Sequence, residues 1–164
     1  DNWCVGVLVQ TNFGGDLIIN GVPVGRELAD IEKGRGDEGG SCMIIVATDA
    51  PLSPRNLKRL AKRAFLAFGR VGSYSGNGSG DYVIAFSTYE KNRVIYGSSK
   101  IRNIEELPNN RMNPLFKAVV EAAEEAIYNS MFMAETIRGR DGHISEAIPI
   151  EKTLRILEKY NAIK

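Results

Sequence analysis

Residues with distinctive chemistry are scarce in this sequence. Its 164 residues include two cysteines, Cys4 and Cys42, and a single histidine, His143. Two cysteines cannot build a disulfide framework, and without a CxxC motif or a Cys/His cluster they do not indicate a zinc site. One histidine excludes any site that needs two imidazole rings from this chain. We therefore predict no metal and no cofactor.

An excess of charge and long apolar runs are also missing. Lys and Arg number 21 against 20 Asp and Glu, a formal net charge of +1 that argues against a nucleic-acid-binding arm or an anionic-membrane patch. No run approaches the roughly 18 apolar residues that a membrane-spanning helix needs. With 43% hydrophobic and 25% charged residues, the composition is that of a globular chain with one core. Neither nucleic acid nor a membrane is a predicted partner.

The start of the chain carries no recognisable leader. It begins Asp1-Asn2-Trp3, without an initiator methionine, a basic segment or an apolar signal region. We interpret the sequence as a fragment or a processed piece of a longer protein. No compartment can be assigned from such a piece, and a cytoplasmic location is slightly favoured.

Four segments are predicted to be strands, in addition to a short hairpin. Residues 5–9 and 82–87 are rich in β-branched and aromatic residues, and residues 93–96 form a shorter segment of the same kind. The continuous apolar run at 42–47 predicts a strand that is buried on both faces. Asn20-Gly21, between apolar residues on either side, predicts a type I′ hairpin whose second strand is 22–24.

Helical periodicity predicts three helices that cover one sheet, which makes the fold class α+β. Ser53 and Pro54 are typical of a helix N-terminus, and the apolar spacing after them predicts a helix to Phe68, ended by Gly69. Its basic face, Arg55 to Arg63, could bind nucleic acid, but a solvated helix surface is the preferred interpretation. The other two helices are predicted at 113–138, ended by Gly139 and Ala-rich enough to suit a subunit interface, and at 150–160, with Leu154 and Leu157 facing inward.

The junction between Gly40 and Ser41 suggests a cleavage site and a nucleophile. Residues 33–40 contain four glycines in eight positions and are predicted to be flexible, and a buried strand comes directly after them. Cleavage of the Gly40–Ser41 bond would give Ser41 both a hydroxyl and a free α-amine, whose reference pKa of about 7.7–8.0 suits a base near neutral pH. Nucleophile and base would then be one residue, without a histidine. From spacing alone, a plain loop that enters a strand remains the favoured alternative.

Three further side chains could assist Ser41. Asn12 comes after a predicted strand, where its amide could donate a hydrogen bond to an oxyanion or form a turn before Gly14. Ser79 and Asp81 end a second glycine-rich loop, 72–81, and could orient the nucleophile or merely end the loop. That loop lacks the lysine of a P-loop and precedes a strand rather than a helix, so phosphate binding is not predicted.

Several of these motifs together resemble a known family. The segment from Gly40 to Leu52, read as GSCMIIVATDAPL, is similar to the start of the β-chain in P1-type peptidases, the D-aminopeptidase, L-aminopeptidase/D-esterase and β-peptidyl aminopeptidase group. The resemblance covers most of the chain in the same order. It extends through the segments GVLVQTNFG at 6–14, LKRLA at 57–61, NGSGD at 77–81, AFS at 85–87, AET at 134–136, GRDGH at 139–143 and AIP at 147–149.

The resemblance implies a precursor that cuts itself before Ser41 and adopts a four-layer αββα fold similar to N-terminal-nucleophile hydrolases. By the same resemblance, Ser41 is the nucleophile, Asn12 contributes to the oxyanion hole, and Ser79 and Asp81 lie beside the nucleophile. Some members have glutamate at the position of Asp81. Thr11 and Cys42 resemble tolerated variations, and His143 is expected to be structural, with no catalytic role.

Family members are longer, and the resemblance implies that the additional length lies upstream of Asp1. Residues 1–40 would be the C-terminal end of the α-part and residues 41–164 the β-part, which form one structural domain together with the upstream segment. A tyrosine of the family's substrate pocket has no match here and would lie on that segment. The expected partners are a small peptide or amide substrate, the upstream α-part, and further copies of the protein, as a tetramer by resemblance.

The resulting hypothesis is a serine aminopeptidase that hydrolyses short peptides, amides or esters with a free amino end through an acyl-enzyme on Ser41. One alternative is an acyl transferase of similar layout, although those relatives have threonine at the cut. The other is a non-catalytic binding module that uses the basic face from Arg55 to Arg63.

Overall fold

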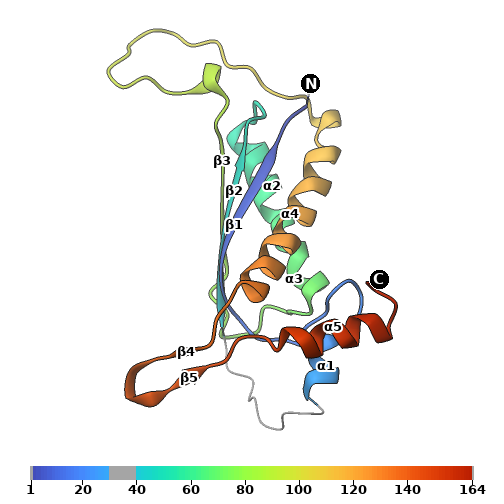
Figure 1. Ribbon diagram of the computed structural model, residues 1–164. Coiled ribbons are helices and arrows are strands. Elements are labelled where there is room, and N and C mark those ends of the chain that lie inside the picture. The colour runs from blue at the N-terminus through green and yellow to red at the C-terminus, as the bar shows by residue number, and fades with distance from the viewer. Residues whose placement is uncertain (1, 30–39, 164) are drawn as a thin grey trace.

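A three-stranded sheet lies at the centre of the structure, a computed structural model that describes residues 2–29 and 40–163 (Figure 1). The strands are β1 (Val5–Asn12), β2 (Ser41–Thr48) and β3 (Tyr82–Ser87), in that order across the sheet. β1 is antiparallel to β2, and β2 is parallel to β3. The three longer predicted strands are thus confirmed, and the first continues to Asn12.

Helices cover one face of this sheet. α2 (Pro54–Ala64), α3 (Leu66–Val71) and α4 (Asn113–Phe132) lie together on that side (Figure 1). Alternate residues of β2, namely Cys42, Ile44 and Val46, are fully buried among them, because successive side chains of a strand point to opposite faces. α4 adds Leu115, Val119, Ala123 and Ile127 to the same core. In the described part of the chain, no helix is long and apolar enough to cross a membrane.

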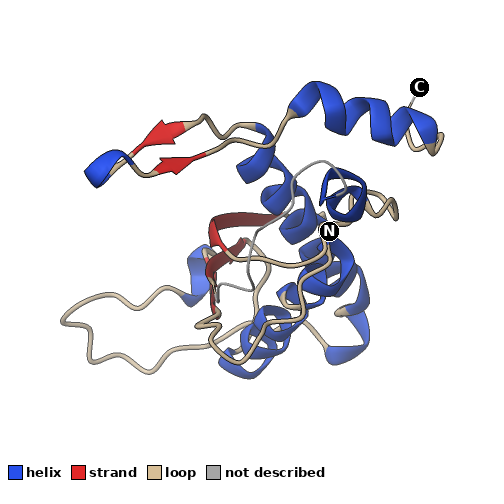
Figure 2. Cartoon of the chain, turned by 90° about the horizontal axis from the view of Figure 1, so that it is seen from below, coloured by secondary structure: helices blue, strands red, loops and turns tan. Residues whose placement is uncertain are grey.

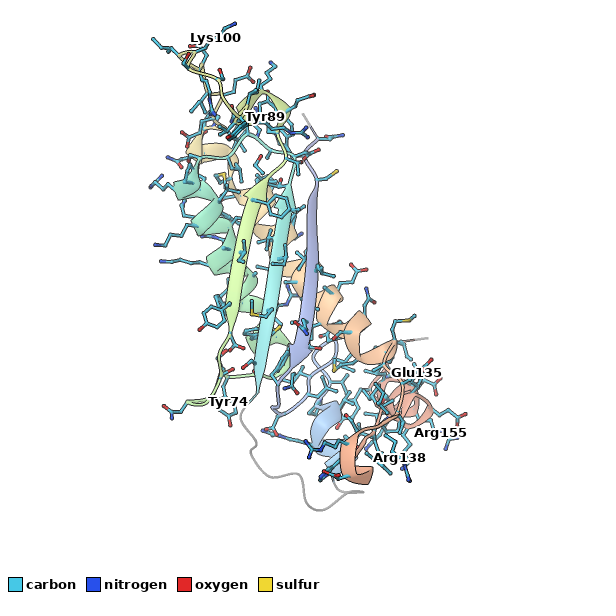
Figure 3. All side chains as sticks on the ribbon, turned by 90° about the vertical axis from the view of Figure 1, so that its left-hand side faces the viewer. Tyr74, Tyr89, Lys100, Glu135, Arg138 and Arg155 are labelled. Atoms are coloured by element: carbon cyan, nitrogen blue, oxygen red, sulfur yellow. The ribbon has the colours of Figure 1, made fainter. Side chains whose placement is uncertain are left out.

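The opposite face of the sheet is open (Figure 3). Its apolar side chains are largely exposed, with Leu8 at 70%, Tyr82 at 63% and Ile84 at 54%. The prediction that the strand at 42–47 is buried on both faces is therefore wrong for this chain, since Met43 on the open face is 37% exposed. An all-apolar run suits two covered faces, and the described residues cover only one.

The predicted N-terminus of α2 is confirmed. Ser53 accepts a hydrogen bond from the backbone N–H of Asn56 at 3.4 Å, and Pro54 is the first helical residue. Two arginines of the basic face lie over the ring of Phe116 in α4, Arg63 at 3.5 Å and Arg59 at 5.0 Å from its centre. This engagement with α4 supports the interpretation of the basic face as helix surface.

The Asn20-Gly21 turn forms, but the residues after it differ from the prediction. Both turn residues have positive φ, 49° and 81°, and Ile19 and Val22 bridge across the turn. The expected strand at 22–24 is wrong, because α1 (Val24–Ala29) begins there. Pro23 explains the change, since its fixed φ and missing N–H suit the residue before a helix better than a strand.

Two helix ends also differ from their predicted positions. Gly69 does not end the first predicted helix, because α3 continues to Val71 and ends at Gly72. The φ of Gly72 is 89°, a conformation that favours glycine, and a Cβ added there would lie 1.8 Å from the Asp16 carbonyl oxygen. The predicted helix to Arg138 ends at Phe132. Residues beyond it form a hairpin of β4 (Ile137–Arg138) and β5 (Ile144–Ser145).

Two segments extend away from the helices on the side of the open face (Figures 1 and 2). One is the β4–β5 hairpin, and the other is the connection between β3 and α4. The predicted strand at 93–96 is wrong, because these residues are in that connection, where Tyr96 is fully exposed and no strand of the described residues pairs with them. A short β-rich segment without a pairing partner does not form a strand.

The C-terminal helix α5 (Ile150–Lys159) packs on α1 in a second, smaller cluster with Ile19 and Val22. Leu157 is buried as predicted, whereas Leu154 is 39% exposed. Thr153 and Ile156 take the inward positions instead. Lys159 closes the contact by pairing with Glu27 of α1 at 2.8 Å.

Candidate active site

Asn12 and Ser41 face each other at one end of the sheet. Asn12 is the last residue of β1, Ser41 is the first residue of β2, and the two are directly paired in the antiparallel ladder. Directly opposed residues point to the same side, and alternation with buried Cys42 places both on the open face. Asn12 is exposed and Ser41 is half-buried. A predicted nucleophile and a predicted oxyanion donor are thereby brought together.

The glycine-rich loop before β3 holds the Ser41 hydroxyl. The backbone N–H of Gly80 donates to Ser41 Oγ at 3.1 Å. Because β2 and β3 are parallel, the residues before β3 lie beside the first residues of β2. A Cβ on Gly80 would lie 3.2 Å from Ser41 Oγ, so a glycine allows this close approach without displacing the hydroxyl.

Asp81 joins the loop to the strand that begins at Ser41. Its Oδ1 accepts from the backbone N–H of Cys42 at 2.8 Å, and its Oδ2 accepts from Ser79 Oγ at 2.7 Å. The short side chain of this aspartate thus reaches both partners. Both of its oxygens are used to fix the residue after Ser41 and the serine of the loop.

The end of β1 is tied to α4 on the opposite face. Thr11 Oγ1 lies 2.8 Å from Ser130 Oγ, and Ser130 Oγ donates to the Ile127 carbonyl at 2.7 Å. Since the Ser130 proton is used in that second bond, Thr11 is the donor to Ser130. The residue before Asn12 is therefore anchored to the helix layer.

Cys42 is not a competing nucleophile. Its side chain is fully buried on the covered face. Burial, aided by the nearby Asp81 carboxylate, raises the pKa of the thiol to about 11. The thiol is therefore protonated at neutral pH, and the thiolate is the reactive form of cysteine.

The four predicted site residues and Gly40 all lie at this end of the sheet, whereas His143 does not join them. His143 is exposed in the β4–β5 hairpin, where its backbone holds the turn through Gly139 and Arg140. The predicted flexible segment falls outside the described residues at 33–39. Two contributors were missed by sequence reasoning. Gly80 acts through its backbone, and Ser130 is 119 residues from Thr11, so neither leaves a local signal.

Another pocket lies away from Ser41. A pocket lined by Trp3, Tyr89 and Leu107, among others, includes none of the predicted residues. It lies by the start of β1 and beyond the end of β3, at the opposite end of the sheet from Ser41. Across residues 2–29 and 40–163, no group of three or more His, Cys, Asp or Glu side chains could hold a metal ion.

Comparison with known proteins identifies relatives for nearly the whole chain. The model of peptidase family S58 matches residues 1–145. The β-peptidyl aminopeptidase BapA of Sphingosinicella microcystinivorans is 39% identical over 178 residues, which cover 99% of this chain and 45% of the relative. BapA of Sphingosinicella xenopeptidilytica is 38% identical, over 95% of this chain and 42% of its own length. The chain thus spans less than half the length of these relatives.

Solved structures share the fold. The PH0078 protein of Pyrococcus horikoshii OT3 is 47% identical with a TM-score of 0.87, over 97% of this chain and 43% of its own. The L-aminopeptidase D-Ala-esterase/amidase of Ochrobactrum anthropi is 30% identical with a TM-score of 0.80, over 98% and 49%, and is described as a variant of the Ntn hydrolase fold. The predicted fold class is confirmed: the chain is an α+β part of that αββα architecture and contributes one helix layer and one sheet layer.

Proposed function

The chain belongs to peptidase family S58, and on this basis we propose that it is part of a self-processing serine aminopeptidase. The observation that carries the proposal is the pairing of Asn12 with Ser41. The hydroxyl oxygen of Ser41 also accepts a hydrogen bond from the backbone N–H of Gly80. A hydroxyl, a side-chain amide and a carboxylate then lie at one end of an uncovered sheet face. The hydroxyl can act as the nucleophile of acyl transfer, and the amide can donate to the oxyanion that forms.

The first reaction is cleavage of the chain itself. Ser41 Oγ attacks the Gly40 carbonyl carbon, the Gly40–Ser41 C–N bond breaks, and the hydroxyl proton passes to the leaving nitrogen. Water then hydrolyses the resulting ester, which leaves a carboxylate on Gly40 and restores the Ser41 hydroxyl. The product is a chain that begins at Ser41 with a free α-amine.

The second reaction is hydrolysis of a substrate by the new terminus. The α-amine, with a reference pKa of about 7.7–8.0, accepts the proton of Ser41 Oγ as the hydroxyl attacks a substrate carbonyl. Asn12 donates to the oxyanion, and a donor of this kind contributes about 2.7–4 kcal/mol to lowering the barrier. The protonated α-amine gives this proton to the leaving nitrogen of the substrate as the scissile C–N bond breaks, which leaves an acyl ester on Ser41. Water then hydrolyses the ester, releases the acid and restores the Ser41 hydroxyl. Asp81 holds the Cys42 N–H and Ser79, and so keeps the terminus aligned.

The active protein requires more than this chain. The open face carries exposed apolar side chains over all three strands, among them Leu8, Ile84 and Phe86, and apolar patches of this kind mark interaction sites. We propose that an upstream α-part covers this face and completes the substrate pocket. The names of the relatives suggest a short peptide or amide with a free amino end as substrate, and assembly into homo-oligomers is proposed with it.

Replacement of Ser41 tests the proposal. In the whole protein, Ser41→Ala should remain one chain on a denaturing gel and release no amine from an aminoacyl anilide, because the variant has no nucleophile. Ser99→Ala, at an exposed loop serine, should be cut and active like the wild type. N-terminal sequencing of the wild type should find a chain that begins Ser-Cys-Met-Ile. Normal cleavage in Ser41→Ala would refute the assignment.

A further inference from the structure

Gly40 is pressed against the end of β1. A Cβ placed on Gly40 would lie 2.1 Å from the Asn12 carbonyl oxygen and 2.4 Å from the Phe13 Cα. Real Cβ atoms essentially never lie closer than 3.0 Å to a heavy atom of a residue that is not their neighbour in the chain. Both obstacles belong to the backbone, so no change of side-chain rotamer can relieve the overlap.

The position of Gly40 matters because Asn12 and Ser41 form the last pair of the β1–β2 ladder. On one side of Ser41, the Gly80 N–H holds its Oγ, and on the other, Gly40 enters through the space beside Asn12. A side chain at position 40 must therefore either push Asn12 out of the ladder or move the Gly40 carbonyl away from the Ser41 hydroxyl. The first movement separates Asn12 from Ser41, and the second separates the Gly40 carbonyl from the hydroxyl that attacks it in the cleavage step.

We infer that Gly40 is a specificity determinant of self-cleavage, because only a residue without a Cβ fits between the scissile bond and the backbone of Asn12 and Phe13. This inference rests on the proposed function, in which the Gly40–Ser41 bond is the one that breaks. The restriction applies only while residue 40 is joined to Ser41. After cleavage, the carboxylate end can move away from β1, so the identity of residue 40 affects maturation and not the turnover of substrate.

The test uses the whole protein with Gly40→Ala, followed as the fraction of uncut chain over time by gel and intact mass. Cleavage should slow roughly tenfold or more, since about 1.4 kcal/mol of added barrier already gives a factor of ten. The matched control is Gly69→Ala in α3, where a Cβ meets nothing within 4 Å, and this variant should be cut at the wild-type rate. Cleavage of Gly40→Ala at the wild-type rate would overturn the inference.

A second measurement separates maturation from folding and from catalysis. Uncut Gly40→Ala should unfold in one cooperative thermal transition, as uncut Ser41→Ala does, which would show that the slow variant is folded. The protein is also produced as two co-expressed chains, one that ends at residue 40 and one that begins at Ser41. In this form, Gly40→Ala should turn over substrate like the unchanged two-chain protein. A loss of turnover there would overturn the restriction to maturation.

The wild-type protein distinguishes this inference from the function on which it rests. If the wild type is never cut between Gly40 and Ser41, the proposed function fails, and the inference fails with it. If the wild type is cut there and Gly40→Ala is cut equally well, only the inference fails.

Discussion

The two faces of the central sheet differ in what covers them. On the helix side, Cys42, Ile44 and Val46 have no exposed surface. On the other side of the same sheet, Leu8 and Phe86 are exposed at 70% and 44%. The two sets differ because successive side chains of a strand point to opposite faces of the sheet. The covered face supplies stability, whereas the open face carries both the candidate active site and the exposed apolar surface that an upstream part is proposed to cover.

Ser41 is held in position from the covered face of the sheet. The groups that fix it are anchored in the covered layer: Thr11 bonds to Ser130 of α4, and Cys42 is buried below the sheet while its N–H binds Asp81. Ser41 and Asn12 themselves remain accessible on the other side. A rigid support on one face and access on the other are what a preorganised site needs.

The largest effect is expected from a charge on the open face. If the upstream part covers Leu8 in the whole protein, Leu8→Glu buries an unpaired carboxylate, and this should cost about 3–5 kcal/mol. Urea denaturation of the whole protein should measure this loss in the free energy of unfolding. Lys58→Glu, at an exposed position of α2, should stay within about 0.5 kcal/mol of the wild type. Unchanged stability of Leu8→Glu would show that the open face is not an internal interface.

A smaller effect is expected from truncation on the covered face. Ile44→Ala removes a fully buried side chain beneath α4 and should lower the free energy of unfolding by about 2–5 kcal/mol, from lost burial and the cavity left behind. Urea denaturation measures this change. Lys62→Ala on the exposed side of α2 should stay within about 0.5 kcal/mol of the wild type. Equal losses in the two variants would contradict the assignment of the core.

The smallest effect is a pH dependence that belongs to the covered face. Because the pKa of Cys42 is about 11 in the folded protein, against 9.0 for an ordinary thiol, the unfolded chain releases this proton first as pH rises. The stability contribution is complete below pH 9 and is lost toward pH 11. Urea denaturation over this interval should give a shallower decline for Cys42→Ala than for Cys4→Ala.

Tyr128 acts in the same direction at higher pH, since burial raises its pKa to about 12, and it does so in both variants. The comparison therefore rests on the difference between their slopes and not on their absolute stabilities. Identical slopes would show that the Cys42 thiol is not protected by the fold.

Local sequence was sufficient for some elements and misleading for others. Ser53-Pro54 marked the start of α2, and Asn20-Gly21 marked a turn, because caps and turns depend on a few neighbouring residues. The strand expected after Gly21 became α1, and the helix expected to reach Arg138 ended at Phe132. At the first position, Pro23 favours the start of a helix, and α1 then packs on α5. At the second, tertiary pairing decided the outcome, because Ile137 pairs with Ser145.

The site residues show the same division. Ser41, Asn12, Ser79 and Asp81 were identifiable from the sequence through the family resemblance, without any knowledge of their distances. The hydrogen bonds from Gly80 to Ser41 and from Thr11 to Ser130 could not be predicted, because they join residues 39 and 119 positions apart. Such contacts depend on how strands and helices pack, which no local pattern records.

Local properties such as propensity, capping and side-chain type indicated which segments could be strands or helices and which residues carry a hydroxyl, an amide or a carboxylate. Three contacts depend instead on the folded arrangement: the pairing of Asn12 with Ser41, the bond from the Cys42 N–H to Asp81, and the position of Gly40 against the β1 backbone. Strand register and loop packing fix these contacts, since they bring together groups that the chain keeps far apart.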